Sequence, residues 1–313
     1  MEKNQKQLTI GLLVYNEERY ISETIKSLLN QTYQNFNLII LDNASTDKTA
    51  EICKNYEKKD NRIIFIGQSE NKGSFFSFKH VLEKTKTPYF MFCAGHDQWE
   101  SSFIEKLLPI IQKEKLALVY PQAREITMEN KLGEVYEEDY TTIGIEKPAK
   151  RYEYVLKKMG MCNAIYGIWN TDILKKCYVK KPIIAGDVLI ILKASLLGKF
   201  KQHKEVLFYR RTIRKENNQY SRQIRYAAGE NRKGRSVVSL KNKFVKENLK
   251  ILHEEEFGLK FFEKKFLSLL TLIIWFKKIY LRSFLISFLK RLLPEDKYLV
   301  FESKMKKKIK KFL

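Results

Sequence analysis

The alternation of short apolar runs with amphipathic helical segments in the first 120 residues constrains the fold most strongly. Runs typical of buried strands are Leu8–Val14, Leu38–Leu41, Ile63–Ile66, Tyr89–Cys93 and Leu116–Tyr120. Between them, apolar side chains recur at helical spacing over residues 17–29, 45–56, 73–84 and 101–112. Strands that alternate with helices form βαβ units, so we predict an α/β fold with a mostly parallel sheet covered by helices on both faces.

The positive charge is concentrated in the last third of the chain. Residues 1–198 hold 28 of the 59 basic and 25 of the 36 acidic residues, so the remaining 115 residues carry +20 of the net charge of +23. Such asymmetry is typical of a surface that meets anions, either phospholipid or nucleic acid. We therefore predict a nearly neutral α/β domain over residues 1–215 and a basic, mainly helical region over residues 216–313.

Cysteine usage and apolar length indicate a cytoplasmic protein. The four cysteines lie far apart with no CxxC pair, which disfavours a zinc or redox site. The first 18 residues lack the apolar run of a signal peptide. The longest apolar stretch, Phe266–Phe276, is about half of the ~20 residues that a spanning helix needs. We expect no transmembrane helix.

Polar and acidic residues follow the first, second and fourth predicted strands. These segments are Tyr15–Glu17, Asp42–Asp47 and Gly95–Trp99. Ligands of open parallel sheets bind outside the carboxyl ends of the strands, so the three segments should share one pocket. The pocket lacks a Gly-rich loop with a lysine and suits a nucleoside, with a divalent cation to neutralise a diphosphate.

The residues in these segments resemble family 2 glycosyltransferases, which have the GT-A fold. The similarity begins with LTIGLLVYNEERYISETIKSLLNQTYQNFNLIILDNASTDKTAEIC and continues through SENKGSFFSFKHVLEKTKTPYFMFCAGHDQW. It includes MCNAIYGIWNTDILKK and AGDVLIILKASLLGKF and ends near VLFYRR, at about residue 211. Five short motifs in the right order make the resemblance specific.

The resemblance implies a role for each matching residue. Asp187 would be the base that deprotonates the acceptor hydroxyl in an inverting reaction, and Asp97 would bind Mn²⁺ or Mg²⁺ at the donor diphosphate. Asp42 would accept a hydrogen bond from the nucleotide base. The other implied donor contacts are Tyr15, Glu17, Asn43, Ser45, Lys72, Gly73, His96, Arg210 and Arg211.

One departure from the family pattern concerns the metal. His96 stands where relatives have the first carboxylate of the metal motif, and an imidazole suits Mn²⁺ better than Mg²⁺. Mn²⁺ is therefore the favoured ion. His96 has two further interpretations, a contact with the ribose or an ordinary loop histidine.

Simpler structural interpretations stay open beside these roles. Asp42 could form an Asx-turn, and Asp187 could cap the helical run that follows it. Lys72 could be a solvated lysine. Arg210 and Arg211 are neighbours on a predicted strand, so only one of them should face the site.

The basic C-terminal region has two apolar stripes at helical spacing, over residues 261–274 and 284–293, flanked by lysines. Basic amphipathic helices bind anionic membrane surfaces, which would place the protein at the inner face of the cell membrane beside a lipid-linked acceptor. Alternatively, the stripes pack on each other or on the catalytic domain. The oligomeric state stays open.

The sequence thus predicts an inverting enzyme that moves a sugar from a nucleotide-diphosphate sugar, UDP-sugar favoured, to a glycan or lipid-linked acceptor in cell-surface polysaccharide synthesis. Two alternatives remain. His96 is compatible with a catalytically impaired relative that binds the donor. The charge of +23 is compatible with a nucleic-acid-binding protein, although no nucleic-acid module is present in the sequence and we expect no such partner.

Overall fold

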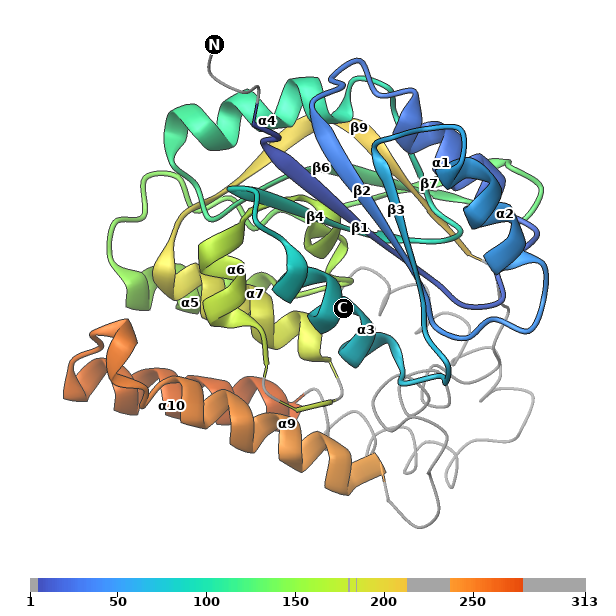
Figure 1. Ribbon diagram of the computed structural model, residues 1–313. Coiled ribbons are helices and arrows are strands. Elements are labelled where there is room, and N and C mark those ends of the chain that lie inside the picture. Colours follow the sequence, from blue (N-terminus) through green and yellow to red (C-terminus); the bar gives the residue numbers. More distant parts are fainter. Residues whose placement is uncertain (1–4, 180, 184, 213–236, 278–313) are drawn as a thin grey trace, which may run out of the picture.

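A computed structural model describes residues 5–179, 181–183, 185–212 and 237–277 (Figure 1). Its described residues form a nine-stranded sheet in the order β3-β2-β1-β4-β8-β6-β9-β5, with β7 paired to β6. The strands are β1 Leu8–Val14, β2 Phe36–Asp42, β3 Ile63–Gly67, β4 Tyr89–Ala94, β5 Gln98–Trp99, β6 Leu118–Ile126, β7 Leu132–Tyr136, β8 Ile168–Asn170 and β9 Phe200–Arg211. β1 to β4 are mutually parallel, as are β6 and β9, whereas β8 runs antiparallel to both of its neighbours. The predicted α/β fold is confirmed.

Helices cover both faces of the sheet (Figure 1). One core cluster includes side chains from α1 Ile21–Leu29, α2 Thr49–Glu57 and α4 Phe103–Glu114. The other includes side chains from α3 Ser74–Lys84, α5 Pro148–Lys158, α6 Thr171–Cys177 and α7 Gly186–Leu197. α7 is buried nearly all round, which agrees with its uniformly apolar sequence.

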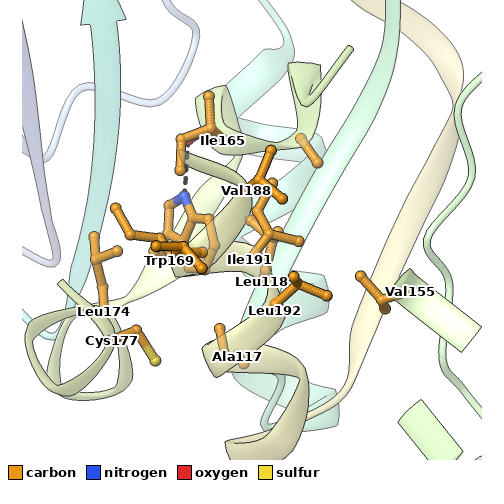
Figure 2. Packing of buried hydrophobic residues seen from close by; sticks show 14 of the residues in the cluster. Ala117, Leu118, Val155, Ile165, Trp169, Leu174, Cys177, Val188, Ile191 and Leu192 are labelled. Atoms are coloured by element: carbon orange, nitrogen blue, oxygen red, sulfur yellow. Dashed lines mark hydrogen bonds between the residues drawn. The ribbon is translucent and has the colours of Figure 1, made fainter. Parts of the chain in front are cut away.

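Trp169 on β8 lies at the centre of the second cluster (Figure 2). Its side chain is fully buried, and its indole Nε1 donates a 2.9 Å hydrogen bond to the carbonyl oxygen of Ile165. Leu118, Leu174 and Val188 belong to the same cluster, so β6, α6 and α7 meet at this point. Truncation of a buried Trp to Ala typically costs 3–5 kcal/mol.

Two local predictions were wrong. The helix expected from Ser45–Asp47 begins at Thr49, because Asp42 and Asn16 accept hydrogen bonds from Ser45 and Thr46 and hold the preceding residues as a loop. The strand expected over Leu116–Tyr120 is longer, since β6 continues through the polar residues that follow, as far as Ile126, and pairs with β7. Tertiary pairing with β9 extends β6 through these polar residues.

Part of the basic C-terminal region packs on the α/β domain. α9 Val237–Ile251, a short 3₁₀ turn Glu255–Phe257 and α10 Phe261–Phe276 add Phe244, Leu252 and Leu267 to the core cluster that contains α5 and α7. The predicted division at residue 215, and the second apolar stripe over 284–293, lie outside the described residues, so the two-domain description stays a prediction. Within the described part of the chain, no helix has the length and apolarity required to cross a membrane.

Candidate active site at the strand ends

The ends of β1, β2 and β4 bring three polar segments together. The parallel register pairs Val14 with Asp42 and Leu13 with Ala94, so the loops that follow these strands leave the sheet side by side. This geometry is the usual position of ligand sites in open α/β sheets. Hydrogen bonds connect residues of all three segments.

Asp42 holds the loop that follows β2. Its carboxylate accepts hydrogen bonds from the backbone N–H of Ser45, at 3.2 Å to Oδ2, and from the Ser45 hydroxyl. The Ser45 hydroxyl oxygen in turn accepts from the N–H of Asn16 at 3.0 Å. Asn16 has a left-handed backbone, φ 55°, and presents Tyr15 as a partly exposed ring beside this loop. Asp42 therefore forms a turn of the Asx type, the simpler of the two roles predicted for it.

Asn43 connects the loop that follows β2 to the loop that follows β3. Its Nδ2 donates a 2.6 Å hydrogen bond to Asn71 Oδ1, and its Oδ1 accepts from the N–H of Lys72 at 3.0 Å. Gly73 follows with φ 82°, a conformation that favours glycine, and is the N-cap residue of α3. The Lys72 side chain points to solvent, with its ammonium 3.9 Å from Glu70.

Glu17 and His96 meet where β1 and β4 end. Glu17 Oε1 lies 2.9 Å from His96 Nδ1, and both side chains are largely buried. Gly95 permits this approach, because a Cβ atom there would lie 2.9 Å from Glu17 Cγ. A carboxylate that accepts from Nδ1–H fixes the tautomer in which Nε2 is a lone-pair donor, an arrangement common for metal-bound histidine.

Asp97 lies beneath His96 and is only 1% exposed. Its Oδ1 accepts a 2.8 Å hydrogen bond from the backbone N–H of Arg211 and lies 3.9 Å from His96 Nε2. Burial raises the pKa of Asp97, and Glu17 adds to the rise, whereas His96, the Arg211 N–H and Arg210 act in the opposite direction. The pairing of β5 with β9 brings Arg211 to this position.

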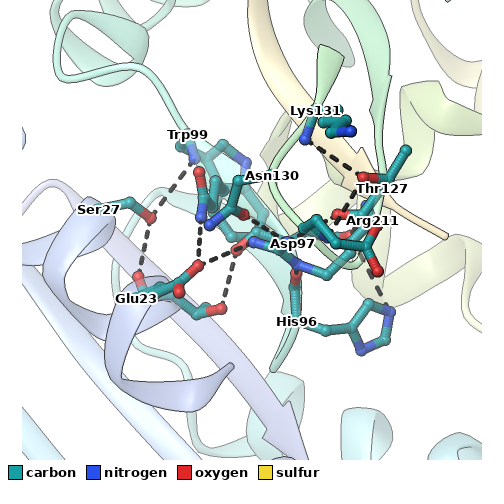
Figure 3. Close-up of polar contacts among 12 residues, drawn as sticks. Glu23, Ser27, His96, Asp97, Trp99, Thr127, Asn130, Lys131 and Arg211 are labelled. Carbon is teal, nitrogen blue, oxygen red and sulfur yellow. Dashed lines mark hydrogen bonds and ion pairs between the residues drawn. The ribbon is translucent and has the colours of Figure 1, made fainter. Parts of the chain in front are cut away.

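Arg211 itself is committed to protein contacts (Figure 3). Its fully buried guanidinium donates to the carbonyl oxygens of His96 and Thr127 and forms a 3.0 Å ion pair with Glu23. It also lies 4.5 Å from the ring centroid of Tyr20. The side chain thus fixes the loop that carries His96 and Asp97, and only its main-chain N–H reaches Asp97.

Arg210 precedes Arg211 on β9, so strand alternation turns its side chain to the other face of the sheet. Its Nη1 donates a 2.8 Å hydrogen bond to Asn163 Oδ1. Burial opposes its charge, but Tyr166, Asp97 and other acidic groups nearby together raise the pKa of Arg210. The same guanidinium opposes the rise in the pKa of both Asp97 and Asp187. Which arginine meets a donor stays a prediction.

Asp187 lies in the first turn of α7, with Ala185 before it in a left-handed conformation. Its Oδ1 accepts a 2.9 Å hydrogen bond from the N–H of Val188. Surrounding protein atoms raise the pKa of Asp187 by desolvation, and Val188 and Arg210 oppose the rise. The residue nevertheless lies exposed at the protein surface.

Three residues of the site escaped the sequence analysis. Asn71 joins the loops after β2 and β3, and Glu138 and Asn163 lie beside Arg210. Asn71 and Asn163 both fell inside segments with family resemblance, but no pattern distinguishes either of them from a surface asparagine. Glu138 lies in a run of acidic residues that reads as a solvated loop.

The described residues contain no group of three or more His, Cys, Asp or Glu side chains able to hold a metal ion. Asp97 and His96 supply two donors at most. A magnesium-type ion is commonly held by one or two carboxylates together with substrate phosphates. The two residues therefore fit an ion that arrives with a diphosphate better than a permanently bound one.

Acidic and polar residues gather where the parallel strands of this α/β fold end, and comparison with known proteins identifies the class. Residues 9–169, about half of the chain, match the model of glycosyl transferase family 2. The chain therefore belongs to this family. The matched segment ends just after η1 Asn163–Tyr166, so it includes every pocket residue described above except Asp187, Arg210 and Arg211.

Two similar proteins are named for the synthesis of teichuronic acid or teichoic acid. The chain is 33% identical over 106 residues to the putative teichuronic acid biosynthesis glycosyltransferase TuaG of Bacillus subtilis, covering 34% of this chain and 42% of that protein. It is 40% identical over 98 residues to the teichoic acid poly(glycerol phosphate) polymerase of Staphylococcus epidermidis, covering 30% of this chain and 13% of the polymerase. The chain spans about half the length, or less, of these curated relatives.

The fold is also that of a solved glycosyltransferase. Residues 1–349 of S. aureus TarS, crystallised with UDP-GlcNAc, superpose with a TM-score of 0.65 and 17% identity, covering 87% of this chain and 73% of that one. At this identity the similarity concerns the fold alone. It confirms the GT-A architecture expected from the sequence.

Proposed function

We propose that this protein transfers a sugar from a nucleoside diphosphate sugar, with UDP-sugar favoured, to a hydroxyl of a glycan or lipid-linked acceptor, in the synthesis of a cell-surface polymer. The observation that supports the proposal is the group of Glu17, His96 and Asp97 at the ends of β1 and β4, with Arg210 as a cation that lowers the pKa of both Asp97 and Asp187. This arrangement provides one carboxylate for the diphosphate end of a donor and another for an acceptor. The named relatives of the chain support a surface polymer as the product.

The nucleoside would lie over the loops after β1 and β2. Tyr15 would cover the base, and Asn43 would hold the Lys72–Gly73 loop against it. Asp42 and Ser45 are hydrogen-bonded to each other, so they would mainly shape the loop. The remaining lone pairs of the Asp42 carboxylate could accept a hydrogen bond from the base. Arg211 would act through the position that it gives to Asp97.

In the proposed reaction, a lone pair of the acceptor hydroxyl attacks the anomeric carbon as the bond to the diphosphate oxygen breaks. Asp187 takes the hydroxyl proton, and the nucleoside diphosphate leaves with the bonding pair. A single displacement inverts the anomeric configuration. Arg210 stabilises the negative charge that develops on the leaving group, in a water-poor setting where a fixed cation is most effective.

A divalent ion, Mn²⁺ favoured, would be held by Asp97 and by His96, whose orientation Glu17 fixes. Such an ion, when bound, would neutralise the diphosphate. His96 also supports the second candidate, a relative that binds the donor with impaired transfer, since one acidic ligand is replaced. Measured turnover separates the two.

The outer face of α10 would contact the anionic inner face of the cell membrane. Phe262, Phe266 and Leu269 are 81%, 50% and 60% exposed and share one face of the helix, while Leu267 is buried on the opposite face. Neighbouring lysines, with the basic residues beyond, provide attraction to anionic headgroups.

A thermal-shift screen of UDP, GDP, CDP and dTDP, with and without Mn²⁺, tests the proposal. We expect one nucleotide to raise the melting temperature, and Mn²⁺ to increase the effect. A folded sample that responds to none of the four would contradict the proposal. Release of the same nucleotide from its sugar conjugate would then exclude the impaired relative.

A further inference from the structure

Two buried polar atoms beside Arg210 have no hydrogen-bond partner of acceptable geometry among the described residues. They are Nδ2 of Asn163 and Oε1 of Glu138. Buried polar atoms are almost always paired, because burial without a partner forfeits the hydrogen bonds that water would make. Two such atoms on adjoining side chains therefore indicate a missing hydrogen-bond partner, which a bound ligand would supply.

The other atoms of the same two side chains are firmly held. Glu138 Oε2 accepts a 3.0 Å hydrogen bond from the backbone N–H of Asn163, and Asn163 Oδ1 accepts a 2.8 Å bond from Arg210. Asn163 is only 6% exposed and begins η1 directly after Cys162, whose backbone is left-handed at φ 60°. Each side chain is thus fixed through one atom, while its other polar atom has no partner of acceptable geometry among the described residues, although the Met161 N–H and the Tyr140 hydroxyl lower the pKa of the Glu138 carboxyl.

The pair adjoins both ends of the proposed reaction. Arg210 donates to Asn163, and the backbone N–H of the next residue, Arg211, donates to Asp97. The Arg210 guanidinium also lowers the pKa of Glu138 and of Asp187. The transferred sugar must bridge a diphosphate at Asp97 and an acceptor at Asp187. A group beside Arg210 therefore faces that sugar rather than the nucleoside, which would lie over the loops after β1 and β2.

The chemistry of the two atoms identifies the group that they would bind. Nδ2 of Asn163 only donates, and a carboxylate oxygen of Glu138 only accepts. A hydroxyl does both at once, so it satisfies the pair. We propose that Asn163 and Glu138 form a subsite that binds one hydroxyl of the transferred sugar, an inference that rests on the proposed function.

Exchange of donor and acceptor tests this assignment. Asn163→Asp keeps the oxygen that Arg210 needs but replaces the donor by an acceptor. Glu138→Gln keeps an oxygen for the Asn163 N–H but replaces the acceptor by a donor. The double variant restores one donor, one acceptor and the original net charge with their positions exchanged, and a hydroxyl can rotate to match it.

Binding is measured by calorimetry with free UDP and with UDP-GlcNAc, UDP-glucose and UDP-galactose, or with the matching conjugates of another nucleotide if the thermal-shift screen selects one. We expect each single variant to weaken the best-bound sugar conjugate roughly tenfold while free nucleotide binds as before. The double variant should recover most of the loss.

Three outcomes overturn the subsite. They are equal losses for nucleotide and conjugate, no loss in either folded single variant, and a double variant no better than the sum of the singles. The last result would indicate a buried water or a purely structural pair. A wild-type protein that binds no nucleotide would instead refute the proposed function, and the subsite with it, so the two failures are distinguishable.

Discussion

The backbone N–H of Arg211 donates a 2.8 Å hydrogen bond to Oδ1 of Asp97, and the Nε of its side chain donates to the carbonyl oxygen of the neighbouring His96. One residue thereby fixes the positions of both residues of the expected metal motif. Its guanidinium is not available to a donor phosphate. Arg210, one position earlier on the same strand, faces the opposite way and is the arginine expected to face the donor.

Asp97→Asn should separate stability from function. Because burial raises the pKa of Asp97, the ionised carboxylate costs stability at any pH above its ordinary value of 3.8. The amide keeps an oxygen for the Arg211 N–H and removes the charge, so we expect a higher melting temperature than wild type at pH 7. The difference should vanish below about pH 3.8, where both side chains are neutral in both states.

The same variant should lose roughly 100-fold in transfer activity, because a charge that stabilises the leaving diphosphate is missing. Melting curves across this pH range, combined with transfer assays at pH 7, check both statements. A variant less stable than wild type at neutral pH would show that Asp97 contributes favourably to folding in its ionised form.

Asp187→Asn should remove the base without disturbing the donor site. We expect transfer to fall by about 10²–10⁴-fold, with the affinity for nucleotide sugar unchanged. Asp172→Asn is the matched control, because Asp172 is an exposed carboxylate in the first turn of α6. Turnover close to wild type in the Asp187 variant would remove this residue from the mechanism.

His96→Asp should make the protein depend on metal. The new carboxylate would face Glu17, which lies 2.9 Å from the present imidazole, so two like charges would adjoin in a largely buried site. We expect a lower melting temperature without metal, recovered by Mn²⁺ or Mg²⁺ in the presence of UDP. Unchanged stability with no response to either ion would argue against a metal at this position.

Arg211→Ala should destabilise the fold by about 3 kcal/mol or more. It leaves the carbonyl oxygens of His96 and Thr127 without their donor and removes the ion pair to Glu23. Urea denaturation measures the loss. Arg211→Lys retains the charge without the planar fork and should recover only part of it, whereas full recovery would mean that charge alone matters.

The exposed face of α10 should control vesicle binding. Replacement of Phe262, Phe266 and Leu269 by Ser should abolish cosedimentation with phosphatidylglycerol vesicles, and phosphatidylcholine vesicles should bind wild type weakly. Ile64→Ser, at a 48% exposed position on β3, is the control. Equal partition of the triple variant and wild type would exclude this face as the contact.

The sequence alone determined the α/β class and the family, because strand and helix periodicities are local and the motifs after β1, β2 and β4 are contiguous. It also placed Asp42, His96 and Asp97 at one sheet edge, since the carboxyl ends of parallel strands must coincide there. The start of α2 and the length of β6 were mispredicted, because hydrogen bonds from distant residues set both.

Only the tertiary structure decided which way each arginine faces and which polar residues lie beside Arg210. Strand alternation turns Arg210 and Arg211 to opposite sides, but the direction of each depends on how β9 pairs with β5 and β6. Glu138 and Asn163 are 25 residues apart in the chain and meet through one hydrogen bond. Contacts of this kind depend on how distant segments pack together, so no periodic pattern in the sequence predicts them.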